Sequence, residues 1–187
     1  MKPQYACYHE LIREGFPSTD AVAFSDLSLL LSYAYNQKKI IEIGTRYART
    51  TVNLAKFCAA DGHVFSIDID QKQHEQYNSL IDPYKSKITF IEENTLIIDW
   101  GKYPQLKDAD MILIDGCHNH DGVLCDTKAA LALIKKGGFI FWHDFVDGNM
   151  HDPEEPLMGR PGIVCKVIRE LNLPVLPVGQ YLGMLAC

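Results

Sequence analysis

The sequence predicts an α/β protein with a doubly wound, mostly parallel sheet that is covered by helices on both faces. Short apolar runs alternate with longer amphipathic segments, which is the pattern of strands joined by crossover helices. The short runs have no polar face, as expected of strands that are buried on both sides. The 187 residues fit a single domain, since domains usually contain about 100–200 residues.

The first predicted element is a helix over Phe24–Tyr35, because its leucines recur at helical spacing. We expect this helix to be a lid or a flank of the site. Lys39–Gly44 is a buried strand, and Arg49–Ala60 carries its apolar residues on one stripe, as a crossover helix does. Val64–Asp68 predicts the second strand.

The middle of the chain continues the same alternation. Gln71–Ile81 predicts a helix that stops near a proline, and Lys87–Ile91 and Met111–Asp115 predict the third and fourth strands. Asp121–Leu133 predicts a helix whose end is marked by two lysines and two glycines, a typical helix terminus. Phe139–Trp142 predicts the fifth strand.

The last part of the chain begins with a polar segment, Val146–Pro161, and a loop of this length is usually functional. A helix over Ile163–Leu171 and two short strands over Val175–Val178 and Tyr181–Ala186 follow. We therefore predict one domain, 1–187, in four parts: an N-terminal flank 1–37, a core 38–145, a loop 146–161 on the acceptor side, and a C-terminal part 162–187.

Composition and charge exclude several classes of protein. The net charge of -6 argues against nucleic acid as a partner. The apolar runs are far shorter than the roughly 20 residues that span a bilayer. The first residues lack the apolar stretch of a signal peptide, and the six cysteines are scattered, so we expect a cytoplasmic protein with reduced thiols. Assembly into a homo-oligomer stays open.

Unusual polar residues follow the predicted strands. Any one of them could simply cap a helix or pair with a cation. The carboxyl ends of parallel strands, however, meet at one edge of the sheet, where ligands bind in open α/β folds. We therefore predict a site there, built from Glu42, Asp68, Asn94, Thr95, the segment Asp115–His120, His143 and Asp144.

The turn after the first strand has the pattern Glu42-x-Gly44-x-x-x-Ala48. Arg46 stands where a dinucleotide fold has its second glycine, which argues against NAD. The spacing resembles the first motif, E-x-G-x-x-x-G, of class I S-adenosylmethionine-dependent methyltransferases, with alanine in place of the last glycine. The resemblance implies that Glu42 and Gly44 line the methionine part of the cofactor and that Arg46 and Thr50 lie near its carboxylate, and Thr45 is also expected to bind the cofactor.

Asp68 ends the second strand, where a carboxylate can accept hydrogen bonds from both ribose hydroxyls. It could instead cap the next helix, and we favour ribose binding for Asp68 and capping for Asp70. The resemblance implies that Asn94 and Thr95 contact adenine, although their chemistry alone also fits an ordinary turn. Cofactor binding is further expected of Ile69 and Asp115.

The pattern IDG-x-H, then a helix, K-x-GG and HD, resembles the methyltransferase family that includes cephalosporin-hydroxylase-like and sugar O-methyltransferase domains. This resemblance implies a Rossmann-like, seven-stranded sheet in order 3-2-1-4-5-7-6 with the last strand antiparallel. It also implies a divalent cation on Asp115, His143 and Asp144, with His118 as general base. Mg²⁺ is expected, and the histidine also admits Mn²⁺ or Zn²⁺.

The predicted activity is transfer of a methyl group from S-adenosylmethionine to a hydroxyl of a small molecule or sugar. Two other functions stay open: a metal-dependent hydrolase or hydroxylase on the same Asp/His cluster, and a nucleoside-binding module without activity. The histidines could also be solvated polar residues without metal, above all His120, and we interpret Cys117 as a wall residue. The sequence does not identify the acceptor.

Overall fold

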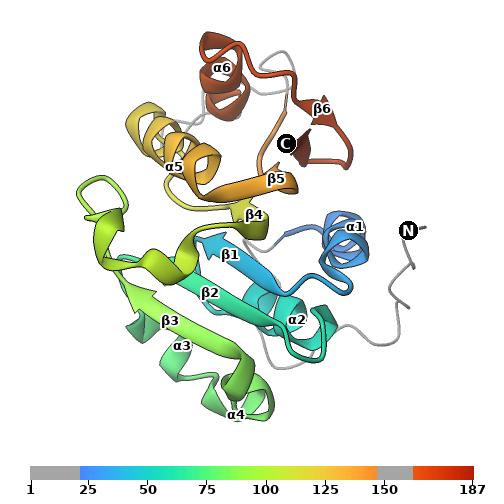
Figure 1. The fold of residues 1–187 in the computed structure, drawn as a ribbon, viewed down its shortest axis with the longest axis vertical. Helices are drawn as coiled ribbons and strands as arrows, with labels where there is room; N and C mark the ends of the chain where they lie inside the picture. The colour runs from blue at the N-terminus through green and yellow to red at the C-terminus, as the bar shows by residue number, and fades with distance from the viewer. Residues whose placement is uncertain (1–21, 147–161) are drawn as a thin grey trace.

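The computed structural model describes residues 22–146 and 162–187. Over these residues the chain forms one seven-stranded sheet in the order β3-β2-β1-β4-β5-β7-β6 (Figure 1). Strands β1 to β5 pair in parallel, and β7 pairs antiparallel with both β5 and β6. The predicted Rossmann-like, doubly wound sheet, its strand order and its antiparallel last strand are confirmed.

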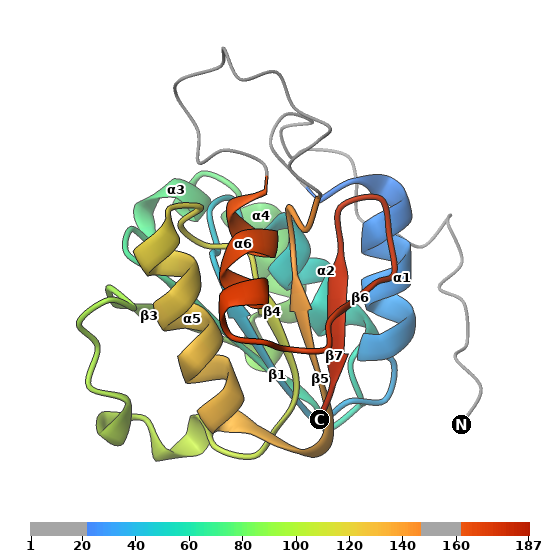
Figure 2. The same cartoon turned by 90° about the horizontal axis from the view of Figure 1, so that it is seen from above.

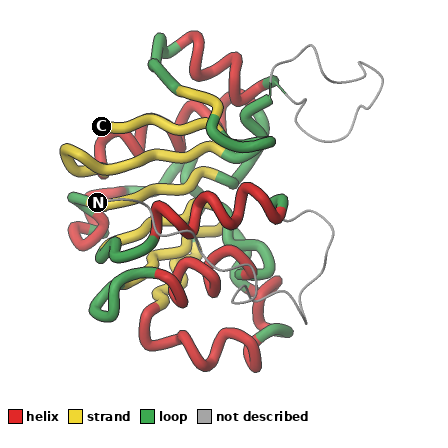
Figure 3. The backbone as a smooth tube through the Cα atoms, turned by 90° about the vertical axis from the view of Figure 1, so that its right-hand side faces the viewer, coloured by secondary structure: helices red, strands yellow, loops and turns green. Residues whose placement is uncertain are grey.

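The strands lie side by side in the backbone trace, with the C-terminus at the end of β7 (Figure 3). Their bounds are β1 (Lys39–Ile43), β2 (His63–Asp68), β3 (Ile88–Glu92), β4 (Ala109–Ile114), β5 (Ile134–Trp142), β6 (Leu176–Pro177) and β7 (Gly183–Ala186). The helices are α1 (Phe24–Ala34), α2 (Arg49–Phe57), α3 (Lys72–Glu75), α4 (Asn78–Ile81), α5 (His120–Leu133) and α6 (Ile163–Glu170).

Two hydrophobic clusters hold the layers together. Helices α1 and α2 pack on one face of the sheet, and α5 and α6 pack on the other (Figure 2). The central strand β4 is buried along its whole length, in keeping with a sequence that is apolar except for Asp110. No described helix is long and apolar enough to cross a membrane.

The predicted helix over 71–81 is wrong in one respect, because the structure has two short helices, α3 and α4, in its place. Tyr77 lies between them with φ -108° and ψ 15°, outside helical geometry. Its ring packs edge-on against Tyr47, with ring centroids 5.6 Å apart. Apolar spacing alone does not reveal this break.

The predicted helix end at Leu133 is confirmed, but Lys135 to Gly138, which were expected to mark that end, belong to β5, and the predicted fifth strand starts at Phe139, five residues too late. Helix α5 ends at Leu133, and the chain enters β5 directly at Ile134. Lys135 forms an ion pair with Asp110 of β4, so this lysine serves the strand pair and not the helix dipole. The lysines and glycines therefore follow a correctly predicted helix boundary, but they belong to the next strand and not to the helix.

Helix α1 is a flank of the sheet. Its leucines Leu30 and Leu31 are fully buried. Asp26, also fully buried, accepts hydrogen bonds from the backbone N–H groups of Gln180 and Tyr181, both at 2.7 Å. The first helix is thus joined to the turn before β7. The predicted acceptor-side loop, apart from Val146, and the first part of the predicted N-terminal flank lie outside the described residues.

Candidate functional site

The turn between β1 and α2 is strongly bent. Gly44, Arg46 and Ala48 all have positive φ, at 102°, 45° and 61°. A Cβ atom on Gly44 would collide with the backbone carbonyl of Asp115, so only glycine fits there. The first turn is therefore in direct contact with the end of β4. Ala48 adopts the left-handed conformation for which the motif otherwise has glycine.

Asp68, at the end of β2, holds this turn in place. Its Oδ2 accepts hydrogen bonds from the backbone N–H groups of Thr45 (2.8 Å) and Arg46 (2.9 Å), and its Oδ1 accepts one from Asp70 (3.1 Å). Each carboxylate oxygen has two lone-pair positions, so Oδ1 keeps capacity for a further donor. Asp70 accepts a bond from the N–H of Lys72 at the start of α3 (2.9 Å), in keeping with its predicted capping role.

Glu42 lies beneath the turn and is only 1% exposed. Its Oε2 accepts hydrogen bonds from the hydroxyls of Thr51 and Ser66. Burial raises the pKa of Glu42 to about 8, although the two hydroxyls oppose the rise. Sequence reasoning missed Thr51 and Ser66. Ser66 interrupts an apolar strand, whereas Thr51 follows another threonine at the start of a helix and carries no local signal.

The remaining predicted cofactor residues lie at the same edge of the sheet with different exposures. Ile69 follows Asp68 and is 65% exposed, which is unusual for a large apolar side chain. Thr50 is buried in the first turn of α2. Asn94 accepts a bond from the N–H of Leu96 (3.0 Å), so its side chain does form the ordinary turn considered above.

Asp126 of α5 was not predicted as a site residue. It is 1% exposed, and neither of its carboxylate oxygens has a full hydrogen bond to a described residue. Burial raises its pKa to about 6, and a weak contact from the Thr95 hydroxyl opposes the rise. Gly116, the residue after Asp115, packs against the carboxylate of Asp126: a Cβ atom on this glycine would lie 3.1 Å from Oδ2 of Asp126.

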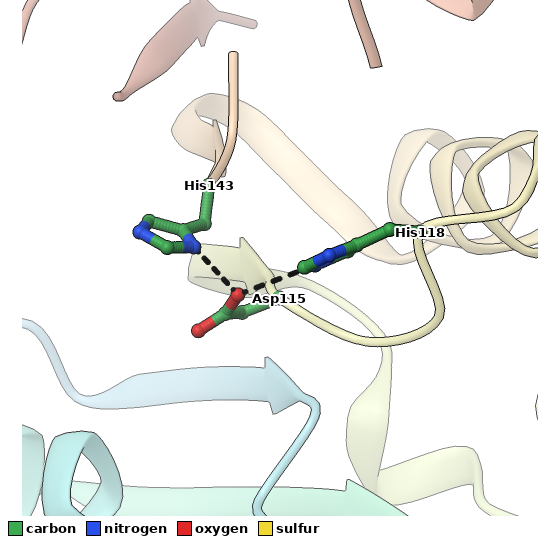
Figure 4. Close-up of side chains that lie close together, drawn as sticks. All are labelled: Asp115, His118 and His143. Carbon is green, nitrogen blue, oxygen red and sulfur yellow. Dashed lines mark ion pairs between the residues drawn. The ribbon is translucent and has the colours of Figure 1, made fainter. Parts of the chain in front are cut away.

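Four predicted residues at the ends of β4 and β5 form one cluster (Figure 4 draws three of them). The Nδ1 atom of His143 lies 2.8 Å from Oδ1 of Asp115 and 3.4 Å from Oδ1 of Asp144. The Nε2 atom of His118 lies 3.7 Å from Oδ1 of Asp115, and its Nδ1 atom lies 3.1 Å from Oδ2 of Asp144. Both imidazoles point toward the Asp115 carboxylate.

The cluster is electrostatically coupled. Burial alone would raise the pKa of Asp115, but His143 and His118 lower it to about 2. Burial alone would lower the pKa of His143, but Asp115 and Asp144 raise it to about 9. Contact with Asp115 also raises the pKa of His118. A positive charge is therefore favoured at the centre of this cluster.

The donor atoms of the cluster fit a divalent cation. Asp115, His118 and His143 each offer one ligand atom, and these atoms lie within 4.8 Å of one another. Nε2 of His118 and Nδ1 of His143 are buried and form no hydrogen bond, only the ion-pair contacts given above. Such nitrogens are costly to bury unless a ligand satisfies them.

His120 and Cys117 do not join the cluster. His120 turns toward α6, where its Nε2 lies 2.7 Å from the Glu170 carboxylate. Cys117 is exposed and accepts a bond from the side-chain amide of Asn119 at 2.9 Å. The five described cysteines are free thiols, two of them buried.

A family model described as "Methyltransferase domain" matches residues 41–145. Among solved structures, the O-methyltransferase TomG from Streptomyces achromogenes in complex with SAM is 21% identical, with a TM-score of 0.68 over 89% of this chain and 81% of TomG. The O-methyltransferase from Bacillus cereus in complex with SAH is 19% identical, with a TM-score of 0.67 over 91% and 84%. No curated protein matches the sequence.

Proposed function

The chain belongs to a family of methyltransferase domains, and from this premise we propose that it transfers a methyl group from S-adenosylmethionine to a hydroxyl oxygen of a small molecule or sugar. One observation carries the proposal. Gly44 of the cofactor turn packs on the backbone carbonyl of Asp115, whose side chain belongs to the Asp/His cluster. A methyl donor bound at the turn would therefore lie beside groups that can activate an acceptor.

The residues at the sheet edge fit the parts of this cofactor. We propose that Asp68 binds the ribose through the free capacity of Oδ1 and that the exposed Ile69 covers the adenine. The full proposed binding set is Glu42, Gly44, Thr45, Arg46, Thr50, Asp68, Ile69, Asn94, Thr95 and Asp115. S-adenosylmethionine supplies the methyl group on its sulfonium centre. The protein's main contribution is then to hold donor and acceptor in line.

We propose that a divalent cation binds to Asp115, His143 and Asp144. When bound, such an ion stabilises the negative charge that develops on an acceptor hydroxyl oxygen. The fit of these residues rests on Nδ1 of His143, which is buried, forms no hydrogen bond and lies 2.8 Å from a carboxylate oxygen of Asp115 and 3.4 Å from one of Asp144.

His118 is the proposed general base. Its Nδ1 lies 3.1 Å from Oδ2 of Asp144, so a proton on Nδ1 is held by that carboxylate. Nε2, which is buried and faces Asp115 at 3.7 Å, is then the nitrogen that we propose takes the proton of an acceptor bound at the cluster. Asp144 thus orients the base in the way that a carboxylate orients the histidine of a catalytic triad.

The test is an assay of S-adenosylhomocysteine release with a panel of catechols, sugars and hydroxylated metabolites. We expect turnover that stops in excess chelator and returns on adding a divalent cation. Full activity of protein shown to be metal-free by elemental analysis would refute the cation and leave the methyltransferase proposal intact. Binding of the cofactor without turnover on any acceptor would favour the inactive nucleoside-binding module.

A metal-dependent hydrolase or hydroxylase on the same cluster would have no use for the turn at Gly44. Such an enzyme should neither bind S-adenosylmethionine nor release S-adenosylhomocysteine. The same assay therefore separates it from a methyltransferase.

A further inference from the structure

We infer that this cluster binds a first-row transition-metal ion in preference to Mg²⁺, because His143 presents an imidazole nitrogen as a ligand. The inference rests on the proposed function for the presence of a cation. It concerns the chemical class of that cation, which can be measured without turnover.

The position of the His143 nitrogen suits metal ligation. Two neighbouring ligands of an ion with bonds of about 2.1 Å lie about 3 Å apart. Nδ1 of His143 is 2.8 Å from Oδ1 of Asp115 and 3.4 Å from Oδ1 of Asp144. The nitrogen is buried and forms no hydrogen bond. The ligand atoms of His143, Asp115 and His118 lie within 4.8 Å of one another, so one small ion can contact these three side chains, and Asp144 lies next to His143.

The ring of His143 is held where it is by its surroundings. Its side chain is 13% exposed, and its backbone N–H donates to the carbonyl of Ile114 at 3.0 Å. The ring of Tyr181 packs edge-on against it, with centroids 6.4 Å apart. Tyr181 is fixed in turn by the bond from its N–H to the buried Asp26. The imidazole is thus preorganised as a ligand.

The donor set decides the metal. Mg²⁺ takes oxygen ligands almost exclusively, whereas imidazole suits Zn²⁺, Fe²⁺, Co²⁺ and Ni²⁺ and is accepted by Mn²⁺. His118 adds a second nitrogen that faces the same oxygen of Asp115, Oδ1. Whether His118 binds the ion or takes the acceptor's proton, it brings no oxygen to the site. Neither role favours Mg²⁺.

The first measurement is competitive calorimetry of the purified full chain with Mg²⁺, Mn²⁺ and Co²⁺. We expect Co²⁺ and Mn²⁺ to bind at least about tenfold more tightly than Mg²⁺. The variant His143→Asp presents oxygen in place of nitrogen, so the preference should shrink severalfold. His120→Ala is the matched control, because His120 contacts Glu170 and not the cluster, and its preference should equal that of the wild type.

The second measurement identifies the ligand atom by pulsed electron paramagnetic resonance of bound Mn²⁺. In the His118→Ala background, we expect modulation from a coordinated ¹⁴N nucleus, and adding His143→Asp should remove it. Thermal unfolding checks that each variant is folded, and His143→Glu replaces His143→Asp if the latter is not. Equal affinity for Mg²⁺ and Co²⁺, or absence of the ¹⁴N signal in His118→Ala, would overturn the inference. Failure to bind S-adenosylhomocysteine would count against the proposed function alone.

Discussion

Asp144 makes two different contacts with its two carboxylate oxygens. Oδ1 faces His143 at 3.4 Å, and Oδ2 faces Nδ1 of His118 at 3.1 Å. Asp144 itself has a positive φ of 53°, which turns the chain sharply after β5. One strained residue at a strand end thus connects the proposed cation ligands to the proposed base.

The variant His118→Ala should lower kcat by about 10²–10⁴, the usual contribution of a positioned general base. The affinity for S-adenosylhomocysteine should stay nearly unchanged, because the imidazole faces the cluster and not the turn at Gly44. Steady-state kinetics on an identified acceptor, together with calorimetry, measures both quantities.

His120→Ala is the natural control for this prediction. His120 forms an exposed pair with Glu170 on α6, and such pairs contribute little to stability. Its loss should leave kcat close to that of the wild type. An inactive His120→Ala with a near-normal His118→Ala would show that the base is misassigned by two residues.

Asp68→Ala should weaken the binding of S-adenosylhomocysteine at least about tenfold, because hydrogen bonds to a charged acceptor contribute roughly 1.5–3 kcal/mol each. Part of this loss comes from the turn, since Asp68 also holds the N–H groups of Thr45 and Arg46. Asp68→Asn keeps one oxygen for the turn and separates the two causes. Unchanged affinity in both variants, measured by calorimetry, would remove Asp68 from the ribose site.

At the scale of single elements, the sequence predicted the strands well because their apolar runs are buried on both faces. It failed where a contact distant in sequence decides the backbone. Tyr77, whose ring packs against Tyr47, lies outside helical geometry between the two short helices that replace the expected one. Lys135 was expected at a helix end, but it lies in strand β5 and forms an ion pair with Asp110 of β4. Neither contact leaves a local pattern.

Asp126 shows the same limit for the site. The sequence placed it on the helix after the IDG-x-H motif but could not show that its carboxylate is sealed inside the protein without a full hydrogen bond. The gathering of the polar residues at the strand ends was predictable because parallel strands bring their carboxyl ends to one edge of the sheet. Buried partners such as Ser66 and Asp126 depend on packing between elements.

The stability of the folded protein should depend on pH because of Asp126. Burial raises its folded-state pKa to about 6, above the unfolded value of about 4. The proton is bound more tightly in the folded state, so the associated stabilisation is present below about pH 4 and is lost as the pH rises through about 6. The difference of about 2 between the folded and unfolded pKa values corresponds to about 3 kcal/mol in the free energy of unfolding.

The variant Asp126→Asn cannot ionise and should escape this loss. Relative to the wild type, its free energy of unfolding should rise between about pH 4 and pH 6, by up to about 3 kcal/mol, and stay constant above that range. Urea denaturation of both proteins at several pH values measures the difference. A difference that does not change with pH would show that Asp126 does not titrate in this way.

At the scale of the whole molecule, the sheet order explains why distant segments meet. The crossovers place β1 beside β2 and β4, so the cofactor turn, Asp68 and Asp115 end at one edge. The β5 end adds His143 and Asp144 to the same edge through its pairing with β4. The sequence therefore predicted which residues gather at this edge of the sheet, and their roles in binding and catalysis stay predictions. The acceptor was not predictable, because the shape of an acceptor surface is not encoded in a local sequence pattern.

The most direct test of the central claim is calorimetric titration of the purified chain with S-adenosylhomocysteine, the product that any methyltransferase using S-adenosylmethionine must release. We predict saturable binding at one site per chain, weakened in Asp68→Ala and preserved in His118→Ala. A folded wild-type chain that produces no heat of binding, and whose thermal unfolding does not shift with this ligand, would contradict the assignment of the strand-end site to S-adenosylmethionine.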